Sequence, residues 1–178
     1  MSALDPNNPD HNNPLKLYPD NFVPTCATLE DCLRLAVHSD DVFYGLLHDM
    51  PIIDNKFREA GVQSVAYTHR LTEVEAKCII MYTMESKRVA KTQQFYKLFC
   101  QAYRQRNEEA LDAFADFSFH FWSGLSKLPD VALPLYRGIN KRLSDINDLY
   151  QKGNKIHWHS ATSCSSDMKV AEKTFAGK

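Results

Sequence analysis

The fold that this sequence predicts is decided by residues 132–177, ALPLYRGINKRLSDINDLYQKGNKIHWHSATSCSSDMKVAEKTFAG. The helical period of the upstream sequence stops after Pro129, and the apolar run at 131–139 is typical of a buried strand. At 156–163 the side chains alternate with period two, which predicts a second strand that ends in hydroxyl groups. The polar residues 140–153 join the two and are expected to form a helix or a turn.

Arg137 interrupts the first predicted strand, and Gly138 follows it directly. A guanidinium on a strand directed to the interior is strongly unfavourable unless it is paired. Its partner is either an internal carboxylate or an anionic ligand held by two parallel hydrogen bonds. At an exposed strand end, a surface acid would be the partner instead. Gly138 has no side chain, so it would let a ligand approach the backbone closely.

The upstream sequence predicts helices. Apolar side chains recur at helical spacing in the segments 28–36, 42–47, 71–86, 95–102 and 111–125. Thr72 and Glu75 have the spacing of a capping box, which predicts where the helix within 71–86 begins. We expect Pro51 to stop the helix before it or to begin a connection. The aromatic side chains of 114–122 recur at helical period and are expected to pack in the core rather than to form a ligand platform.

The order of these segments predicts an α+β fold. Residues 1–24 are rich in Pro, Asn and Asp and have few apolar side chains, so we expect a flexible arm. A helical subdomain is expected at 25–130, followed at 131–178 by the start of a strand region that is incomplete. Within that region, Asp167 is placed to begin a last helix.

The composition is that of an ordinary globular protein. Of 178 residues, 44% are hydrophobic and 24% charged, which suffices for one domain with a core. A formal net charge of −1 gives no general attraction to nucleic acid or to an anionic membrane, so neither is expected as a partner. The five cysteines include no CxxC pair, which indicates neither a disulfide framework nor a zinc site. Lacking a signal-peptide pattern or a long apolar run, the chain is expected to be soluble and cytoplasmic or otherwise intracellular, with secretion as the alternative.

Two motifs within residues 132–177 resemble those of a known enzyme family. LYRG at 135–138 matches an aromatic-Arg-Gly strand, and SATSCS at 160–165 matches a Ser-Thr-Ser strand with cysteine in the middle place. Together they are similar to the first two parts of the arginine, serine, glutamate signature of mono-ADP-ribosyltransferases. The predicted helix at 71–83 and the segment 170–177, VAEKTFAG, also resemble helices of this family. Ala161 departs from the family pattern, which often has an aromatic residue there.

The resemblance implies a helical subdomain followed by the first strands of an ADP-ribosyltransferase-like β-sandwich. It implies NAD as co-substrate, no metal, and Arg137 and Ser163 as catalytic residues. The residues implied to bind NAD are Arg137, Gly138, Ser163 and Ser165. The guanidinium of Arg137 suits the pyrophosphate, Gly138 leaves room for the nicotinamide amide, and Ser163 would donate to the nicotinamide ribose.

The implied reaction transfers ADP-ribose from NAD to a protein acceptor, for which arginine is expected, and releases nicotinamide. Cleavage of the nicotinamide glycosidic bond builds an oxocarbenium-like transition state that a carboxylate stabilises. In the family a later Glu-x-Glu turn supplies this carboxylate, and Glu172 in the last predicted helix is no substitute. We therefore expect the 178-residue chain to be an N-terminal fragment that binds NAD weakly and transfers nothing.

Four other interpretations remain open. A non-catalytic transferase-like module would use the helical subdomain as a protein-binding surface. A helical bundle unrelated to transferases would explain 28–128 but leave both motifs as coincidence. His157, His159 and Cys164 are zinc-ligand types, but an HxH pair without a second close ligand pair is a weak signal, and Cys164 as a nucleophile lacks an assigned base.

Overall fold

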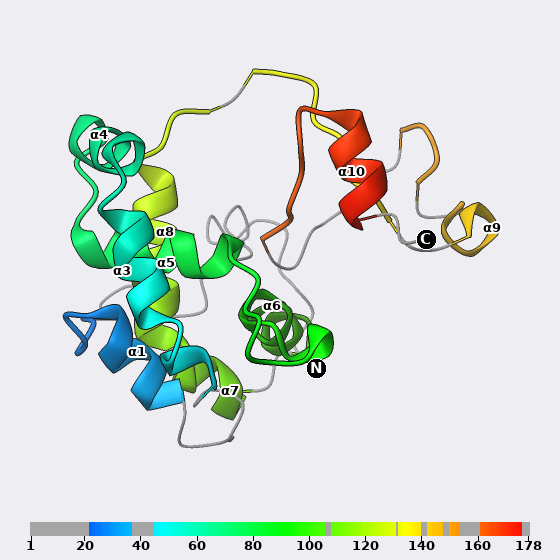
Figure 1. The fold of residues 1–178 in the computed structure, drawn as a ribbon. Coiled ribbons are helices and arrows are strands. Elements are labelled where there is room, and N and C mark those ends of the chain that lie inside the picture. Colours follow the sequence, from blue (N-terminus) through cyan, green and yellow to red (C-terminus); the bar gives the residue numbers. More distant parts are fainter. Residues whose placement is uncertain are drawn as a thin grey trace. The chain divides into compact units, whose positions relative to one another are not determined.

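A computed structural model describes residues 22–36, 45–105, 108–130, 132–139, 142–147, 150–153 and 161–175 (Figure 1). The chain divides into two compact units, Met1–Pro129 and Asp130–Lys178. The first unit contains α1 (Leu29–Ala36), α3 (Met50–Phe57), α4 (Ala60–Thr68), α5 (Glu73–Thr83), the short 3-10 helix η3 (Lys91–Gln93), α6 (Phe95–Gln105), α7 (Glu108–Ala113) and α8 (Ala115–Ser126). The second unit contains α9 (Leu143–Ile146) and α10 (Met168–Phe175). The predicted arm at 1–24 lies outside the described residues except for its last three.

The prediction of an α+β fold with β-sandwich strands is wrong, because the described part of the chain is helical and contains no strand. The region 131–139 contributes a single β-bridge, and 154–160, the larger part of the second predicted strand, lies outside the described residues. Pro134 has no N–H with which to continue the pairing on one side of the bridge. Leu133 and Leu135 are 61% and 54% exposed, so the burial that would favour a strand is absent in this unit.

Helix starts follow the capping pattern of the sequence. The side chain of Thr28 accepts a hydrogen bond from the Asp31 amide at 3.1 Å, at the start of α1. At the start of α5, the Thr72 amide donates to Glu75 Oε2 at 2.8 Å and the Glu75 amide donates to Thr72 Oγ1 at 3.3 Å. Both bonds satisfy amides that have no partner within the helix, so the predicted capping box is confirmed.

Three helical features differ from the sequence-based predictions. The helical residues 45–47 do end before Pro51, at a turn over 48–49, but Pro51 begins α3 instead of a connection. A residue without an N–H is tolerated in the first turn, where the helix has no acceptor for it. The helix α4 was not predicted, since its buried side is limited to Ala66. The helix predicted at 111–125 is divided at Phe114 into α7 and α8.

The core of the first unit is aromatic where α6 packs on α7 and α8. Phe95 and Phe117 have ring centroids 4.5 Å apart, and those of Phe99 and Tyr103 are 4.6 Å apart. Phe99 and Phe121 are 0% and 1% exposed. Rings at these distances pack edge to face or tilted and exclude water from the centre of the unit. The prediction that the aromatic side chains of 114–122 pack in the core is confirmed.

The side chain of Glu75 also joins α5 to α8, which lies against it (Figure 1). It is 4% exposed, and its Oε1 accepts hydrogen bonds from Ser123 Oγ and from Lys127 Nζ, each at 2.6 Å. Burial alone would raise the pKa of Glu75, but the hydrogen bonds from Lys127, Ser123 and the Thr72 backbone more than offset burial, so the pKa lies below its ordinary value. The carboxylate is therefore ionised and fully partnered at neutral pH.

Gly124 lets α8 approach α5 closely at the same place. A Cβ added to it would lie 3.0 Å from the Cβ of Glu75 and 3.2 Å from Cδ1 of Ile79. Both distances are shorter than ordinary carbon contacts, so a larger residue would push the helices apart.

A second buried carboxylate, Asp116 at the start of α8, holds the segment before α1. Its Oδ1 accepts hydrogen bonds from the amides of Thr25 and Cys26, at 2.5 Å and 2.7 Å. The ring Nε2 of His120 lies 2.9 Å from the Cys26 carbonyl oxygen. These contacts join residues about ninety positions apart in sequence, so the entry into α1 is fixed by α8.

Substituting Gly124 by alanine should lower the free energy of unfolding by about 1–3 kcal/mol, because the added methyl group meets Glu75 and Ile79. Urea denaturation at neutral pH measures this. Gly61 in α4 is the matched control: an added Cβ there meets nothing within 4 Å, so Gly61→Ala should be neutral or stabilising by up to about 1 kcal/mol. Equal effects of the two substitutions would contradict the close packing of α5 and α8.

The Glu75→Gln variant should lose about 1–3 kcal/mol of stability at pH 7, since the amide keeps an acceptor but loses the charge that pairs with Lys127. A carboxyl with a lowered folded pKa stabilises above its ordinary value of 4.5 and loses that contribution as pH falls through the lowered pKa. The difference between wild type and Glu75→Gln should therefore shrink below about pH 4.5. Glu59→Gln removes one carboxylate at an exposed position and is the matched control. A difference that stays constant down to pH 3 would contradict this role.

Candidate functional site

The two motifs of the second unit are joined by one antiparallel bridge. The amide of Tyr136 donates to the carbonyl oxygen of Ser165 at 2.7 Å, and the amide of Ser165 donates to the carbonyl oxygen of Tyr136 at 2.9 Å. Such a reciprocal pair fixes the register of the two segments. The segments 135–138 and 161–165 thus lie side by side without forming a sheet.

The predicted site residues flank this bridge. Arg137 and Gly138 directly follow Tyr136, and Ser163 lies two residues before Ser165. The bridge itself is an isolated one, between Tyr136 and Ser165.

The predicted site residues lie at the surface of their unit. Arg137 and Ser163 are exposed, and Gly138 and Ser165 are half-buried. The expectation of a guanidinium inside a buried strand is therefore wrong for this unit. An arginine at the surface keeps much of its hydration, so it does not need the internal carboxylate that a buried guanidinium would need.

Ser165 also takes part in the start of α10. Its Oγ accepts a hydrogen bond from the Asp167 amide at 3.0 Å, and Asp167 Oδ1 accepts one from the Lys169 amide at 2.8 Å. The predicted helix start at Asp167 is confirmed, since a side-chain oxygen satisfies an amide of the first turn. The bridge and α10 are therefore consecutive parts of one local structure, in which Ser165 belongs to both.

The structure offers little to a metal or to a cysteine nucleophile. Within the described ranges, no group of three His, Cys, Asp or Glu side chains is arranged to hold a metal ion. His157 and His159 lie outside the described residues, so the zinc interpretation stays untested. Cys164 is exposed, with its Sγ 3.8 Å from the Thr162 carbonyl oxygen. Burial raises the pKa of the Cys32 thiol, which makes it a poor nucleophile.

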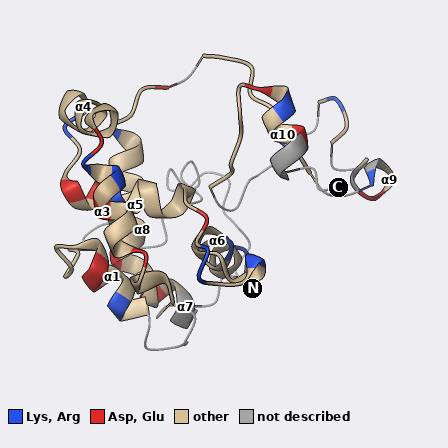
Figure 2. Ribbon diagram, in the orientation of Figure 1, with Lys and Arg blue, Asp and Glu red and all other residues tan. Residues whose placement is uncertain are grey.

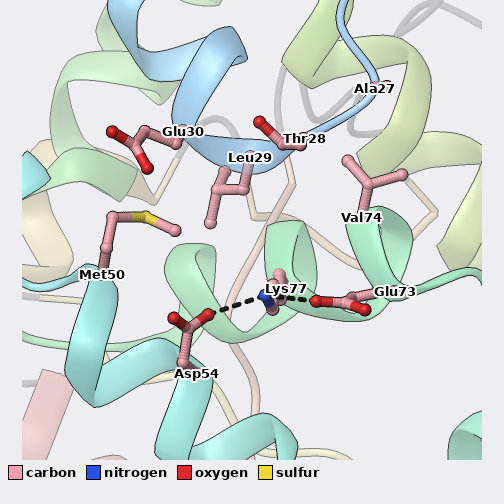
Figure 3. Close-up of a pocket in the computed structure, with 9 residues that line it drawn as sticks. All are labelled: Ala27, Thr28, Leu29, Glu30, Met50, Asp54, Glu73, Val74 and Lys77. Carbon is pink, nitrogen blue, oxygen red and sulfur yellow. Dashed lines mark ion pairs between the residues drawn. The ribbon is translucent and has the colours of Figure 1, made fainter.

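A hollow of about 320 Å³ lies in the first unit, between the start of α1 and the helices α3 and α5 (Figure 3). Lys77 extends along its wall between two acids, with its Nζ 2.6 Å from Asp54 Oδ1 and 2.5 Å from Glu73 Oε1. Burial alone would lower the pKa of Lys77, but both acids raise it, so the pKa lies above its ordinary value and the ammonium stays charged. The Lys77 ammonium therefore links α3 to α5 through these two ion pairs.

Sequence reasoning did not find this cluster. The spacing of Glu73 and Lys77, four residues apart on a helix, is a visible signal for an ion pair. Asp54 comes from another helix, and no local pattern connects it to Lys77.

No protein-family model, no curated protein and no solved structure matches this chain. The helices in the described part of the chain are all too short or too polar to cross a membrane. The function is therefore argued from the residues of the site.

Replacing Asp167 by alanine should destabilise the start of α10 by about 1 kcal/mol, because the Lys169 amide loses its acceptor. Amide hydrogen exchange of Lys169 and its neighbours measures this, and protection should fall about fivefold. Asp167→Asn should keep most of the protection, since asparagine caps helices equally well. Unchanged exchange in the alanine variant would contradict the capping role.

Proposed function

We propose that this chain holds NAD for a mono-ADP-ribosyl transfer, the reaction in which ADP-ribose moves from NAD to a protein side chain and nicotinamide is released. Arginine is the proposed acceptor. The observation that carries the proposal is the pairing of Tyr136 with Ser165, because it joins the two motifs on which the family resemblance rests. The proposal needs this local pairing and does not depend on a sheet.

Arg137 is proposed to hold the pyrophosphate of NAD. Its guanidinium is planar and always charged, and it presents parallel N–H donors that match two phosphate oxygens. The side chain is exposed, which lets it meet a dissolved dinucleotide. Gly138 follows on the same segment, and the absence of a Cβ leaves its backbone open to an amide such as that of nicotinamide.

Ser163 is proposed to orient the nicotinamide ribose through its hydroxyl group, which both donates and accepts hydrogen bonds. In the reaction, the bond between ribose C1′ and the nicotinamide nitrogen breaks, and nicotinamide leaves with the electron pair. An acceptor guanidine nitrogen then bonds to C1′ and loses a proton. Stabilising the positive charge of the transition state requires a carboxylate. Arg137 and Ser163 do not have one, so their proposed role is to hold and orient NAD.

A non-catalytic interaction module is the second candidate, and the exposed apolar side chains of the second unit favour it. Leu133, Leu135 and Met168 are 61%, 54% and 53% exposed in this unit. Large apolar side chains mark a contact site where they form one continuous surface patch. This candidate requires no NAD binding, so one titration separates the two.

Isothermal titration of the full chain with NAD should show saturable binding. Arg137→Ala should weaken it by about tenfold or more, because two charge-assisted hydrogen bonds are lost. Arg137→Lys should give an intermediate affinity, since lysine keeps the charge without the planar fork.

Arg142→Ala is the matched control for this titration, because it removes the same charge from an exposed residue of the same unit. It should bind NAD within about twofold of wild type. Absence of NAD binding at millimolar concentration, or equal loss in both alanine variants, would contradict the transferase proposal and favour the interaction module.

A further inference from the structure

The surface helix α4 carries no charge. Its nine residues read AGVQSVAYT and include no Lys, Arg, Asp or Glu, and Figure 2 shows the helix in tan. The side of a surface helix that faces water is ordinarily charged or polar. Burying this helix against another protein would therefore leave no charged group of α4 without a partner.

Only one narrow side of α4 packs on the first unit. Ala66 is its buried residue, and Val62, one turn earlier, is half-buried. The helix lies against α3. The opposite side carries Ala60, Ser64 and Tyr67, which recur at helical spacing and are all exposed. These three residues form the outward stripe of α4.

The outward stripe is small at one end and large at the other. Ala60 and Ser64 have short side chains, whereas the ring of Tyr67 is large and the residue is 89% exposed. When two copies of such a stripe lie antiparallel about a two-fold axis near Ser64, Tyr67 of each copy lies over Ala60 of the partner subunit. A tyrosine suits this contact, because its ring supplies apolar area while its hydroxyl group stays hydrated.

The residues that flank α4 carry opposite charges. Glu59 precedes the helix and Arg70 follows it, and both are exposed. The same two-fold axis brings Glu59 of each copy toward Arg70 of the partner subunit, whereas a parallel arrangement would bring like charges together. The side chain of Glu59 makes no capping hydrogen bond to α4, so the start of the helix does not depend on it. The surface is therefore complementary to itself in charge as well as in shape.

Arg70 stands where helices usually end in glycine. Its φ is 54°, and the amides of Arg70 and Leu71 donate to the carbonyl oxygens of Tyr67 and Ala66 at 3.2 and 2.9 Å. This left-handed conformation is unfavourable for a residue with a Cβ. A contact made by the guanidinium across the two-fold axis would offset that cost.

We propose that a second copy of this chain docks on α4, in an antiparallel contact about a two-fold axis near Ser64. Closed two-fold dimers are the commonest oligomers of soluble proteins. Two helices about 14 Å long bury less than the about 1,200–2,000 Å² of a stable complex, so the dimer is weak, with a Kd of about 0.1 mM. The inference uses only α4 and its flanking residues, so it goes beyond the proposed function and does not rest on it.

Sedimentation velocity of the full chain between about 10 and about 500 µM tests the inference, because this range spans the expected Kd. A reductant is present throughout, since the exposed Cys164 could otherwise join two chains by a disulfide. The weight-average sedimentation coefficient should rise with concentration toward that of a dimer. A chain that stays monomeric at about 500 µM would overturn the proposal.

Tyr67→Ser removes the large end of the outward stripe and should weaken the dimer about tenfold or more, as the loss of a central aromatic contact does in other interfaces. Leu35→Ser on α1 is the matched control, because Leu35 is a large apolar residue that is 42% exposed on another helix. It should associate as wild type does. Wild-type association of Tyr67→Ser would place the contact elsewhere and overturn the proposal.

A charge exchange tests the antiparallel arrangement. Glu59→Arg and Arg70→Glu each put like charges together and should each weaken the dimer about threefold or more. Arg70→Glu keeps the backbone cost at this position, because both residues carry a Cβ. The chain with both substitutions restores opposite charges and should associate within about twofold of wild type.

Arg104→Glu on α6 is the control for a change of net charge, and it should associate as wild type does. A chain with both Glu59→Arg and Arg70→Glu that is weaker than either single variant would overturn the antiparallel contact. Equal weakening by Arg104→Glu and Arg70→Glu would also overturn it, because the effect would then come from net charge.

Discussion

The arrangement of the first unit depends on one buried carboxylate, that of Glu75. It completes the capping box that begins α5, and it accepts hydrogen bonds from Ser123 on α8 and from Lys127, the residue that follows α8. The Glu75 carboxylate therefore connects α5 to α8. Because Gly124 has no side chain, α8 can lie close enough to α5 for these hydrogen bonds to form. Lys127 also donates to the carbonyl oxygen of Arg70, in the turn before α5, so the same ammonium ties that turn to α8. Loss of this group would affect the start of α5 and the packing of α8 together.

The second unit has no comparable buried centre among its described residues; Ala171 is buried there, whereas the motif residues are exposed or half-buried. Its order comes from a reciprocal pair of backbone hydrogen bonds between Tyr136 and Ser165 and from the cap of α10 by Asp167. Local bonds of this kind position a few residues without a large core. The proposed NAD site needs no more than this, because a guanidinium recognises phosphate oxygens through the geometry of its donors.

The sequence predicted the features that depend on local chemistry. The capping box of Thr72 and Glu75, the start of α10 at Asp167 and the aromatic packing of 114–122 follow from spacing alone. The prediction of strands was wrong because an apolar run forms a strand only where its side chains are buried against another layer, and Leu133 and Leu135 are exposed. Pro134 also has no N–H for pairing with a neighbouring strand. Likewise, the ion pair of Lys77 with Asp54 arises from helices brought together by folding, and no local pattern indicates it.

The central functional claim is that NAD lies at the paired motifs of the second unit. Photo-crosslinking of the full chain with a photoreactive NAD analogue, followed by mass spectrometry of the peptides, tests it most directly. The account predicts labelling within 132–147 or 161–169, and competition by unlabelled NAD should remove it. Labelling confined to peptides of the first unit, or labelling that excess NAD does not reduce, would contradict the account.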